Sequence, residues 1–140
     1  MSLRWEPSLA IGVPAVDDQH RELYRQVNLL LAAMRDTQAA GEVGRLLEFL
    51  GRYVVEHFAA EERLMREARY PALDPHRREH VGFVQAFQEL RRDFEAEGAS
   101  PPVVVRINVW LCSWLRRHVG DTDQALGRFL AGQHRPAAAL

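Results

Sequence analysis

The sequence predicts an all-α fold, an up-down-up-down antiparallel four-helix bundle with an N-terminal arm. Four stretches carry apolar residues three and four positions apart, which is the spacing of one buried helix face. Short connections containing Pro or Gly separate these stretches, so consecutive helices should run antiparallel. No Val/Ile/Thr-rich alternating run stands between turn residues, which argues against β structure. We therefore expect one globular domain over residues 1–140.

The first two predicted helices carry polar and apolar residues on the same stripe. We expect the first helix to begin with Asp17 as its N-cap and the region to end at Gly41. The second should begin near Glu42 and end before Tyr70. The stripes are His20, Leu23, Val27, Leu30 and Met34 in the first helix, and Leu50, Val54, His57, Glu61 and Leu64 in the second. Titratable residues therefore share the faces that should enter the core.

The last two predicted helices repeat this arrangement. The third should begin with Asp74 as its N-cap, followed by a proline, and end at Gly98. The fourth should begin after Ser100 and be interrupted at Gly120, with a short helical segment over residues 121–130. The stripes are His76, His80, Phe83, Phe87, Leu90 and Phe94 in the third helix, and Ile107, Leu111, Trp114 and His118 in the fourth.

The two ends of the chain fall outside the predicted bundle. The bundle should span about residues 17–131, between an arm over residues 1–16 and a frayed tail over residues 132–140. The arm is expected to fold over the bundle through Trp5, Leu9, Ile11 and Val16. His134 lies in the tail, and we do not expect it to join the other five histidines.

Composition excludes several classes of partner and ligand. The 18 basic residues are all Arg and the formal net charge is -1, so no basic field attracts nucleic acid or an anionic membrane. No apolar run is long enough for a membrane span or a secretory signal, and we expect a cytoplasmic protein. The single cysteine, Cys112, excludes an intramolecular disulfide and leaves nitrogen and oxygen donors for any metal.

Five histidines and two carboxylates are candidate metal ligands. His57 with Glu61, and His76 with His80, are four residues apart, so each pair can point two donors from one helix face. In the antiparallel topology, all the histidines of the four helices fall at the same end of the bundle. The candidate ligands are His20, His57, Glu61, His76, His80, His118 and Asp123. Asp123 requires an irregular turn near Gly120 to return to the face of His118.

The number of donors favours two metals over one. Tetrahedral zinc takes about four ligands, fewer than the seven side chains offer. If both carboxylates bridge and one solvent-derived oxygen also bridges, about one of the roughly twelve positions of two octahedra stays open. Imidazole and carboxylate donors suit iron or manganese, whereas affinity order alone favours copper or zinc. The residues alone leave the metal open.

The order of these residues resembles the hemerythrin family, in particular the single-domain bacterial hemerythrins, over residues 5–130. The matching segments are Val16-Asp17-Asp18-Gln19-His20, His57-Phe58-Ala59-Ala60-Glu61, His76-Arg77-Arg78-Glu79-His80, and His118 through Asp123. The resemblance implies a non-heme di-iron centre, oxo- or hydroxo-bridged. It assigns His76, His80 and His118 to one iron, His20 and His57 to the other, and Glu61 and Asp123 to both. Dioxygen would bind the second iron, and we expect Phe58, Trp114, Leu115 and Val119 to form the oxygen pocket.

The function expected from this resemblance is reversible dioxygen binding, for storage, delivery or sensing, without enzymatic activity. One alternative is an enzyme that uses the same centre as a di-iron oxidase, a peroxidase or a consumer of nitric oxide. Another is an interaction module whose fold changes on metal binding. The histidine-rich ligand set favours the carrier, since oxygen-activating bundles use Glu-rich sets.

Overall fold

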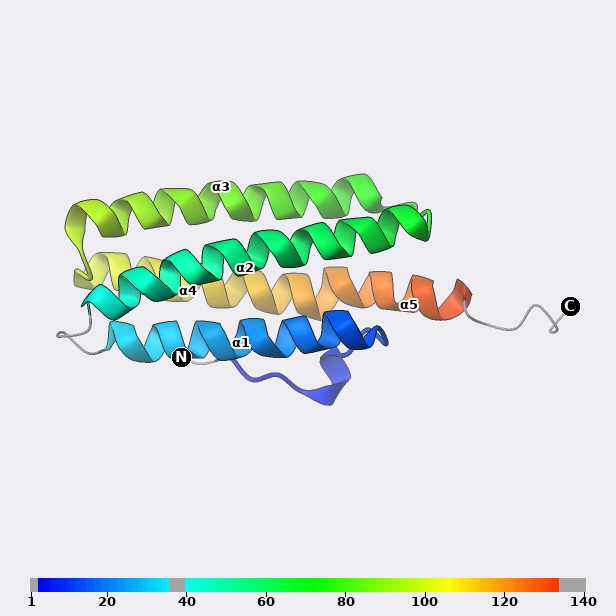
Figure 1. Ribbon diagram of the computed structural model, residues 1–140, viewed down its shortest axis with the longest axis horizontal. Coiled ribbons are helices and arrows are strands. Elements are labelled where there is room, and N and C mark those ends of the chain that lie inside the picture. The colour runs from blue at the N-terminus through cyan, green and yellow to red at the C-terminus, as the bar shows by residue number, and fades with distance from the viewer. Residues whose placement is uncertain (1–2, 36–39, 134–140) are drawn as a thin grey trace, which may run out of the picture.

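The computed structural model describes residues 3–35 and 40–133. All regular elements within these residues are helices (Figure 1), which confirms the predicted fold class. They are a 3-10 helix Pro7–Leu9, α1 Pro14–Met34, α2 Ala40–Glu67, α3 Leu73–Glu97, α4 Pro101–Arg117, a π-helical turn His118–Thr122 and α5 Asp123–Gln133. No helix in the described part of the chain is long and apolar enough to span a membrane. His134 and residues 135–140 of the predicted tail lie outside the described residues.

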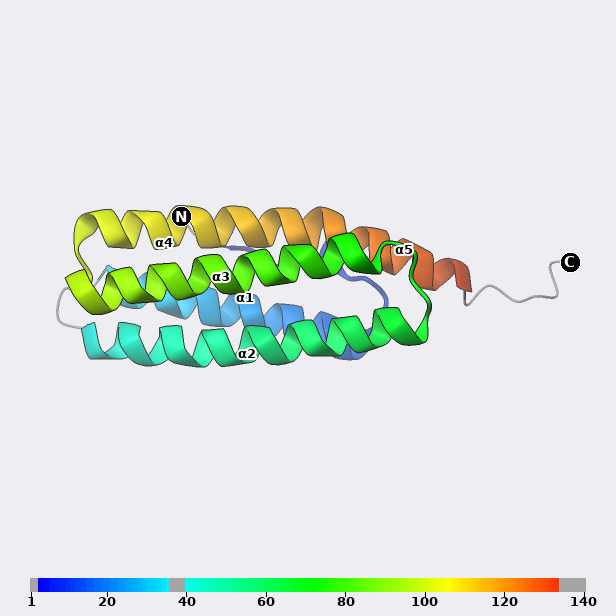
Figure 2. The same cartoon turned by 90° about the horizontal axis from the view of Figure 1, so that it is seen from above.

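The four long helices form the predicted up-down-up-down bundle. α1 packs on α2, α2 on α3, α3 on α4, and α4 closes the bundle against α1. Figures 1 and 2 show this order from two directions, with α5 continuing α4 along the same line. The start of α1, the end of α2, the start of α3 and the end of α4 therefore meet at one end of the bundle.

Apolar side chains form two clusters along the bundle. The main core fills most of its length and includes Leu30, Leu47, Leu50, Phe83, Ile107 and Leu111. The end cluster consists of Ile11, Val16, Met65, Leu126 and Leu130. On three helical segments, a candidate ligand lies along the sequence between one residue of the end cluster and one residue of the main core. These ligands are His20 between Val16 and Leu23, Glu61 between Met65 and Phe58, and Asp123 between Leu126 and Val119. The polar residues thus form a layer between two apolar clusters.

The start of α1 differs from the prediction. The helix begins at Pro14 and follows Val13, so the expected N-cap role of Asp17 was wrong. Proline fits the first helical position because its φ is already helical and its missing N–H would have no partner there. Asp17 instead lies in the first turn, and its carboxylate accepts hydrogen bonds from the backbone N–H of Ile11 at 2.8 Å and of Gly12 at 3.3 Å. It ties the arm to α1.

Other helix boundaries were predicted with mixed success. α1 ends at Met34, and Gly41 lies in the first turn of α2 instead of ending the region. α3 begins one residue before Asp74, whose charge then sits in the first turn, where the helix dipole favours it. The predicted start of α4 after Ser100 and the end of α3 at Gly98, which has a φ of 68°, are confirmed.

The arm packs along the bundle through backbone and side-chain contacts. Asn28 of α1 donates to the Leu3 carbonyl at 2.7 Å and accepts from the Leu3 N–H at 2.9 Å. At α5 the arm passes so close that a Cβ on Gly127 would lie 2.9 Å from the carbonyl oxygen of Ile11. Glycine is therefore required where the arm crosses α5.

Candidate metal centre

The structure brings all seven predicted ligands together in one buried layer. His20 comes from α1, His57 and Glu61 from α2, His76 and His80 from α3, His118 from the π-helical turn and Asp123 from the start of α5. Each is at most 2% exposed. Burying so many titratable groups is costly unless they are paired or bind a cation.

The π-helical turn solves the spacing of His118 and Asp123. On a regular α-helix, residues five apart point about 140° away from each other. Here the Asp123 N–H donates to the His118 carbonyl, the i to i+5 bond of a π-helix, which places both side chains on one face. His118 Nε2 then lies 3.3 Å from Asp123 Oδ1. An irregular turn was expected at this point; its form is a π-helix that leaves the rod unbroken.

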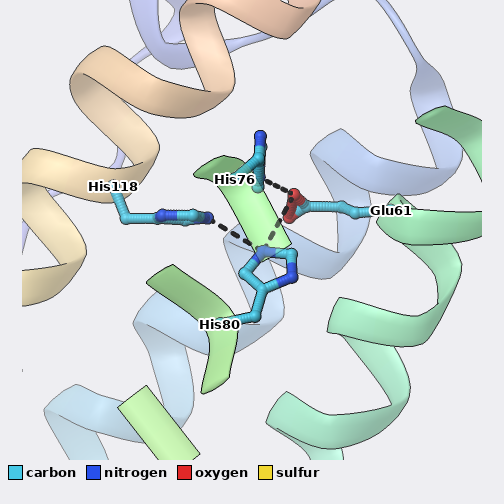
Figure 3. A group of neighbouring side chains, drawn as sticks. All are labelled: Glu61, His76, His80 and His118. Carbon is cyan, nitrogen blue, oxygen red and sulfur yellow. Dashed lines mark hydrogen bonds and ion pairs between the residues drawn. The ribbon is translucent and has the colours of Figure 1, made fainter. Parts of the chain in front are cut away.

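Glu61 lies between two groups of histidines. Its Oε1 is 2.6 Å from His57 Nε2 and 3.5 Å from His20 Nε2. Its Oε2 is 3.2 Å from His76 Nε2 and 3.7 Å from His80 Nε2 (Figure 3). The two oxygens of one carboxylate therefore face opposite groups, which we name the two-histidine half (His20 and His57) and the three-histidine half (His76, His80 and His118).

Asp123 repeats this division from another direction. Its Oδ2 is 3.1 Å from His20 Nε2, in the two-histidine half. Its Oδ1 is 3.1 Å from His76 Nε2 and 3.3 Å from His118 Nε2, in the three-histidine half. Both carboxylates thus have one oxygen on each side of the layer.

The donor atoms of each half are close enough to share a cation. Two groups have all their potential ligand atoms within 4.8 Å of one another: Glu61, His76, His80 and His118, and His20, His57, Glu61 and Asp123. Both groups contain Glu61. His80 Nε2 and His118 Nε2 are only 3.1 Å apart and point toward each other (Figure 3), as nitrogens that bind one metal do.

Several buried atoms in this layer have no hydrogen bond of good geometry within the described residues. They are both ring nitrogens of His20, Nδ1 of His76, Oε1 of Glu61 and both oxygens of Asp123. Such an atom costs about 1–3 kcal/mol when left unsatisfied. Nitrogen and oxygen donors without thiolate suit iron, manganese or zinc, so the residues present fit a bound metal.

Three histidines have a partner on the ring nitrogen that faces away from the layer. Nδ1 lies 2.7 Å from Gln19 Oε1 in His57, 3.0 Å from Glu62 Oε2 in His80, and 2.9 Å from Glu79 Oε1 in His118. With the proton on Nδ1, each ring donates outward and keeps the Nε2 lone pair directed inward, which is the form that binds a metal.

Sequence analysis missed these three partners, although each follows a simple rule. Gln19, Glu62 and Glu79 are each next in the chain to a candidate ligand, yet each contacts a histidine of a different helix. Adjacent helical residues point about 100° apart, so the neighbour of an inward ligand faces the adjoining helix. A polar residue beside a core histidine was the signal that could have found them.

The carboxylates control the charge of the histidines. Burial lowers the pKa of His118, but Asp123 outweighs it and raises that pKa to about 10. Burial likewise opposes protonation of His20 and His76, and the close carboxylates of Asp123 and Glu61 outweigh it and raise both pKa values to about 9. Without a metal, these three rings therefore hold protons at neutral pH.

The same pairing keeps the two carboxylates ionised. Burial and the nearby charge of Glu61 raise the pKa of Asp123, but His118 and His20 outweigh them and lower it to about 2. Burial also opposes ionisation of Glu61, and the surrounding histidines hold its pKa well below the usual range. The layer presents two anions, which favour the binding of divalent cations.

The four residues expected to line an oxygen pocket are all buried near this layer. Phe58 stacks on His80 with ring centroids 3.8 Å apart, and Trp114 stacks on His118 at 4.3 Å. Leu115 and Val119 are buried in the main core. The two aromatic rings thus cover the three-histidine half, whereas the expected oxygen position is in the two-histidine half.

Four antiparallel helices around a buried layer of histidines and carboxylates define a bundle protein with a candidate metal centre. The family model described as Hemerythrin HHE cation binding domain matches residues 11–130. The chain belongs to the hemerythrin family. Hemerythrins are oxygen-binding proteins with a di-iron site, not enzymes, and the buried cluster of this chain fits such a site.

Individual relatives agree with this membership. The chain is 35% identical over 123 residues to a bacteriohemerythrin of Stenotrophomonas maltophilia (strain R551-3), covering 88% of this chain and 78% of that one. It is 33% identical to a bacteriohemerythrin of Methylococcus capsulatus (strain ATCC 33009 / NCIMB 11132 / Bath), covering 86% and 89%. A crystal structure of wild-type hemerythrin superposes with a TM-score of 0.82 at 28% identity, covering 92% of this chain and 98% of that one.

Proposed function

We propose that this chain binds dioxygen reversibly at a di-iron centre in the buried layer. The observation that carries the proposal is the division of Glu61 and Asp123, each with one oxygen toward each half. Carboxylates in this arrangement can hold two metals at once. Iron supplies the electrons that dioxygen needs in order to bind, and the protein supplies the site.

The ligands are proposed half by half. His76, His80 and His118 would hold one iron and His20 and His57 the other, and Glu61 and Asp123 would each be shared by both. The two groups of donor atoms within 4.8 Å of one another support this division, since each half contributes its own histidines and shares Glu61. The two-histidine half has fewer protein nitrogens, so the position for an exogenous ligand belongs there.

The apolar walls keep the bound state reversible. We propose that Phe58, Trp114, Leu115 and Val119 line the oxygen pocket, with the two aromatic rings on the side of the three-histidine half, and their burial at 1–7% exposure supports a site with little water. Exclusion of water slows proton entry and loss of reduced oxygen, the route by which an oxygen carrier decays to its oxidised form. A carrier needs this protection, whereas an oxidase needs a proton donor near its substrate.

The cellular role and location of the protein are part of the same proposal. We propose oxygen storage, delivery or sensing by a single domain over residues 1–140 located in the cytoplasm, with no nucleic acid or membrane as partner. Bacterial relatives and a balanced net charge of -1 support this setting.

The test is anaerobic loading of the purified protein with ferrous iron, followed by admission and removal of dioxygen. Two irons per chain are expected, with visible charge-transfer bands that appear with oxygen and disappear on its removal. The exposed Glu56, one residue from His57, provides a matched control, and Glu56→Ala should behave as the parent protein. Irreversible oxidation that consumes an added reductant would contradict the proposal and favour an enzyme.

A further inference from the structure

One carboxylate holds both ends of the π-helical turn. Glu79 lies on α3 and is one helix away from the turn. Its Oε1 accepts from His118 Nδ1 at 2.9 Å and from the Thr122 hydroxyl at 2.9 Å, and its Oε2 lies 3.1 Å from that same hydroxyl. His118 and Thr122 are the first and last residues of the turn. In the described part of the chain, no other side chain hydrogen-bonds to both.

The turn is the element that puts Asp123 in the buried layer. π-helical turns are rare because they are less favourable than the α-helix that surrounds them. Relaxation of this turn to α-helix would rotate Asp123 by about 100° relative to His118. Asp123 contacts histidines of both halves, so its loss from the layer would affect both. A side chain that stabilises the turn therefore affects the position of Asp123 as well as that of His118.

We propose that Glu79 is a positioning residue that keeps the turn π-helical and so holds Asp123 as the second bridging carboxylate. The assignment of Asp123 as a bridge rests on the proposed function. The clamp itself, a carboxylate joined to the two ends of one turn, rests only on the contacts of Glu79.

Glu62 offers a matched comparison. It is also a carboxylate one residue from a candidate ligand, and it also accepts from a histidine Nδ1, that of His80 at 3.0 Å. Its other ion pair is with the exposed Arg77 at 3.5 Å, and among the described residues it has no hydrogen bond or ion pair with the turn. Removing Glu62 should disturb one histidine, whereas removing Glu79 should disturb His118 and Asp123 together.

The first measurement is amide hydrogen exchange in the metal-free protein, where no iron is involved. The Asp123 amide bonds to the His118 carbonyl in the π-helical form and must break that bond before it can bond to the Val119 carbonyl of an α-helix, so its exchange reports how often the turn opens. Glu79→Ala should speed exchange of that amide by at least about tenfold, because it removes hydrogen bonds to a charged group. Glu62→Ala should leave it unchanged. Equal exchange in Glu79→Ala and the parent protein, or an equal increase in Glu62→Ala, would overturn the clamp.

Two milder variants keep the test valid if Glu79→Ala does not fold. Glu79→Gln retains an oxygen acceptor and should restore part of the protection of Asp123. Thr122→Val removes one hydroxyl at nearly constant volume and should raise exchange by a smaller factor than Glu79→Ala. An unchanged rate in Thr122→Val would show that the Thr122 contact does not hold the turn.

The second measurement is titration of the metal-free protein with Co²⁺, followed by visible absorption. Glu79→Ala should weaken both binding events, since Asp123 serves both halves, and Glu62→Ala should weaken one. Weakening of only one event by Glu79→Ala would overturn the positioning role. If the parent protein binds no metal while the exchange result holds, the proposed function fails and the clamp stands.

Discussion

The two halves of the metal centre share both carboxylates but differ in what supports their histidines. In the three-histidine half, His80 and His118 each direct Nδ1 to a carboxylate, Glu62 and Glu79. In the two-histidine half, the only such partner in the described residues is the neutral amide of Gln19, on His57. A carboxylate on the outer nitrogen makes the inner nitrogen a stronger donor.

This difference in outer partners indicates which half should keep its metal bound, and we call that half the anchor. More histidines and anionic support should make the three-histidine half bind its metal more tightly and fill first. The two-histidine half has fewer and weaker donors, which suits the half that must also accept and release an exogenous ligand. A carrier needs one metal that stays bound and one with an available position, and we expect the outer partners to produce this difference between the halves.

The largest effect should come from removing what the halves share. Glu61→Ala takes one donor from each half, and we expect both metals to bind more than about 100-fold more weakly, since even outer partners contribute 10- to 100-fold. Iron content after desalting is the measurement, with Glu56→Ala as the exposed control. Retention of both irons at the parent level would show that Glu61 does not bridge.

Removing one histidine from each half should separate them. His57→Ala should leave a single metal in the three-histidine half, because that half keeps all of its own nitrogens. His118→Ala should lose more, since the anchor is damaged and the neighbouring half is the weaker one. Metal analysis and oxygen spectra of the two variants provide the comparison. A His57→Ala protein with both irons and parent spectra would count against the ligand assignment.

Exchanging the residues that pair with a histidine Nδ1 should reduce the difference in metal affinity between the two halves. Glu62→Gln gives the three-histidine half a neutral partner, and Gln19→Glu gives the two-histidine half a charged one. Each exchange should change the affinity of its own half by about 10-fold, weaker in the first variant and tighter in the second. Stepwise metal titration measures both constants. The idea fails if the two variants shift the same binding step.

The smallest effect is on the pH dependence of metal binding and of stability. The pKa values of His76 and His118 in one half are about 9 and 10, and that of His20 in the other is about 9. At neutral pH these three rings are protonated without metal, so metal binding should release about three protons, two of them from the three-histidine half. Calorimetry in buffers of different ionisation enthalpy counts them. Release of no protons would contradict the charge state described for the layer.

The same pKa values predict how the stability of the metal-free fold changes with pH. A histidine whose pKa is raised by folding stabilises the fold below its ordinary value near 6.5, and this stabilisation is lost as pH rises through the folded value. The metal-free protein should therefore lose stability between pH 7 and about pH 10. The metal-loaded protein should show little change there. Thermal unfolding at several pH values distinguishes the two forms.

Much of this arrangement could be predicted from sequence because helical periodicity carries it. Spacings of three and four residues place His57 with Glu61 and His76 with His80, and antiparallel topology brings them to one end of the bundle. Side chains that depend on tertiary contacts were harder to predict. Asp is a residue type that often serves as an N-cap, but Asp17 instead accepts a hydrogen bond from the arm. On α2, Met65 fills the buried position that was expected for its neighbour Leu64.

The outer partners were missed for a related reason. Gln19, Glu62 and Glu79 lie on partly exposed helix positions, where sequence patterns predict ordinary surface residues. Their role depends on the rotation of one helix against the next, which periodicity within a single helix does not determine. The π-helical form of the turn also required the structure, since the sequence indicated only that some irregularity must occur between His118 and Asp123.

Two inequivalent metals should share Glu61 and Asp123. Mössbauer spectroscopy of protein loaded with ⁵⁷Fe and oxidised by air tests this sharing most directly. Two kinds of ferric iron in equal amounts, magnetically coupled to a diamagnetic ground state, are the expected result. A spectrum of isolated, uncoupled ferric ions would contradict the sharing of Glu61 and Asp123 by two metals.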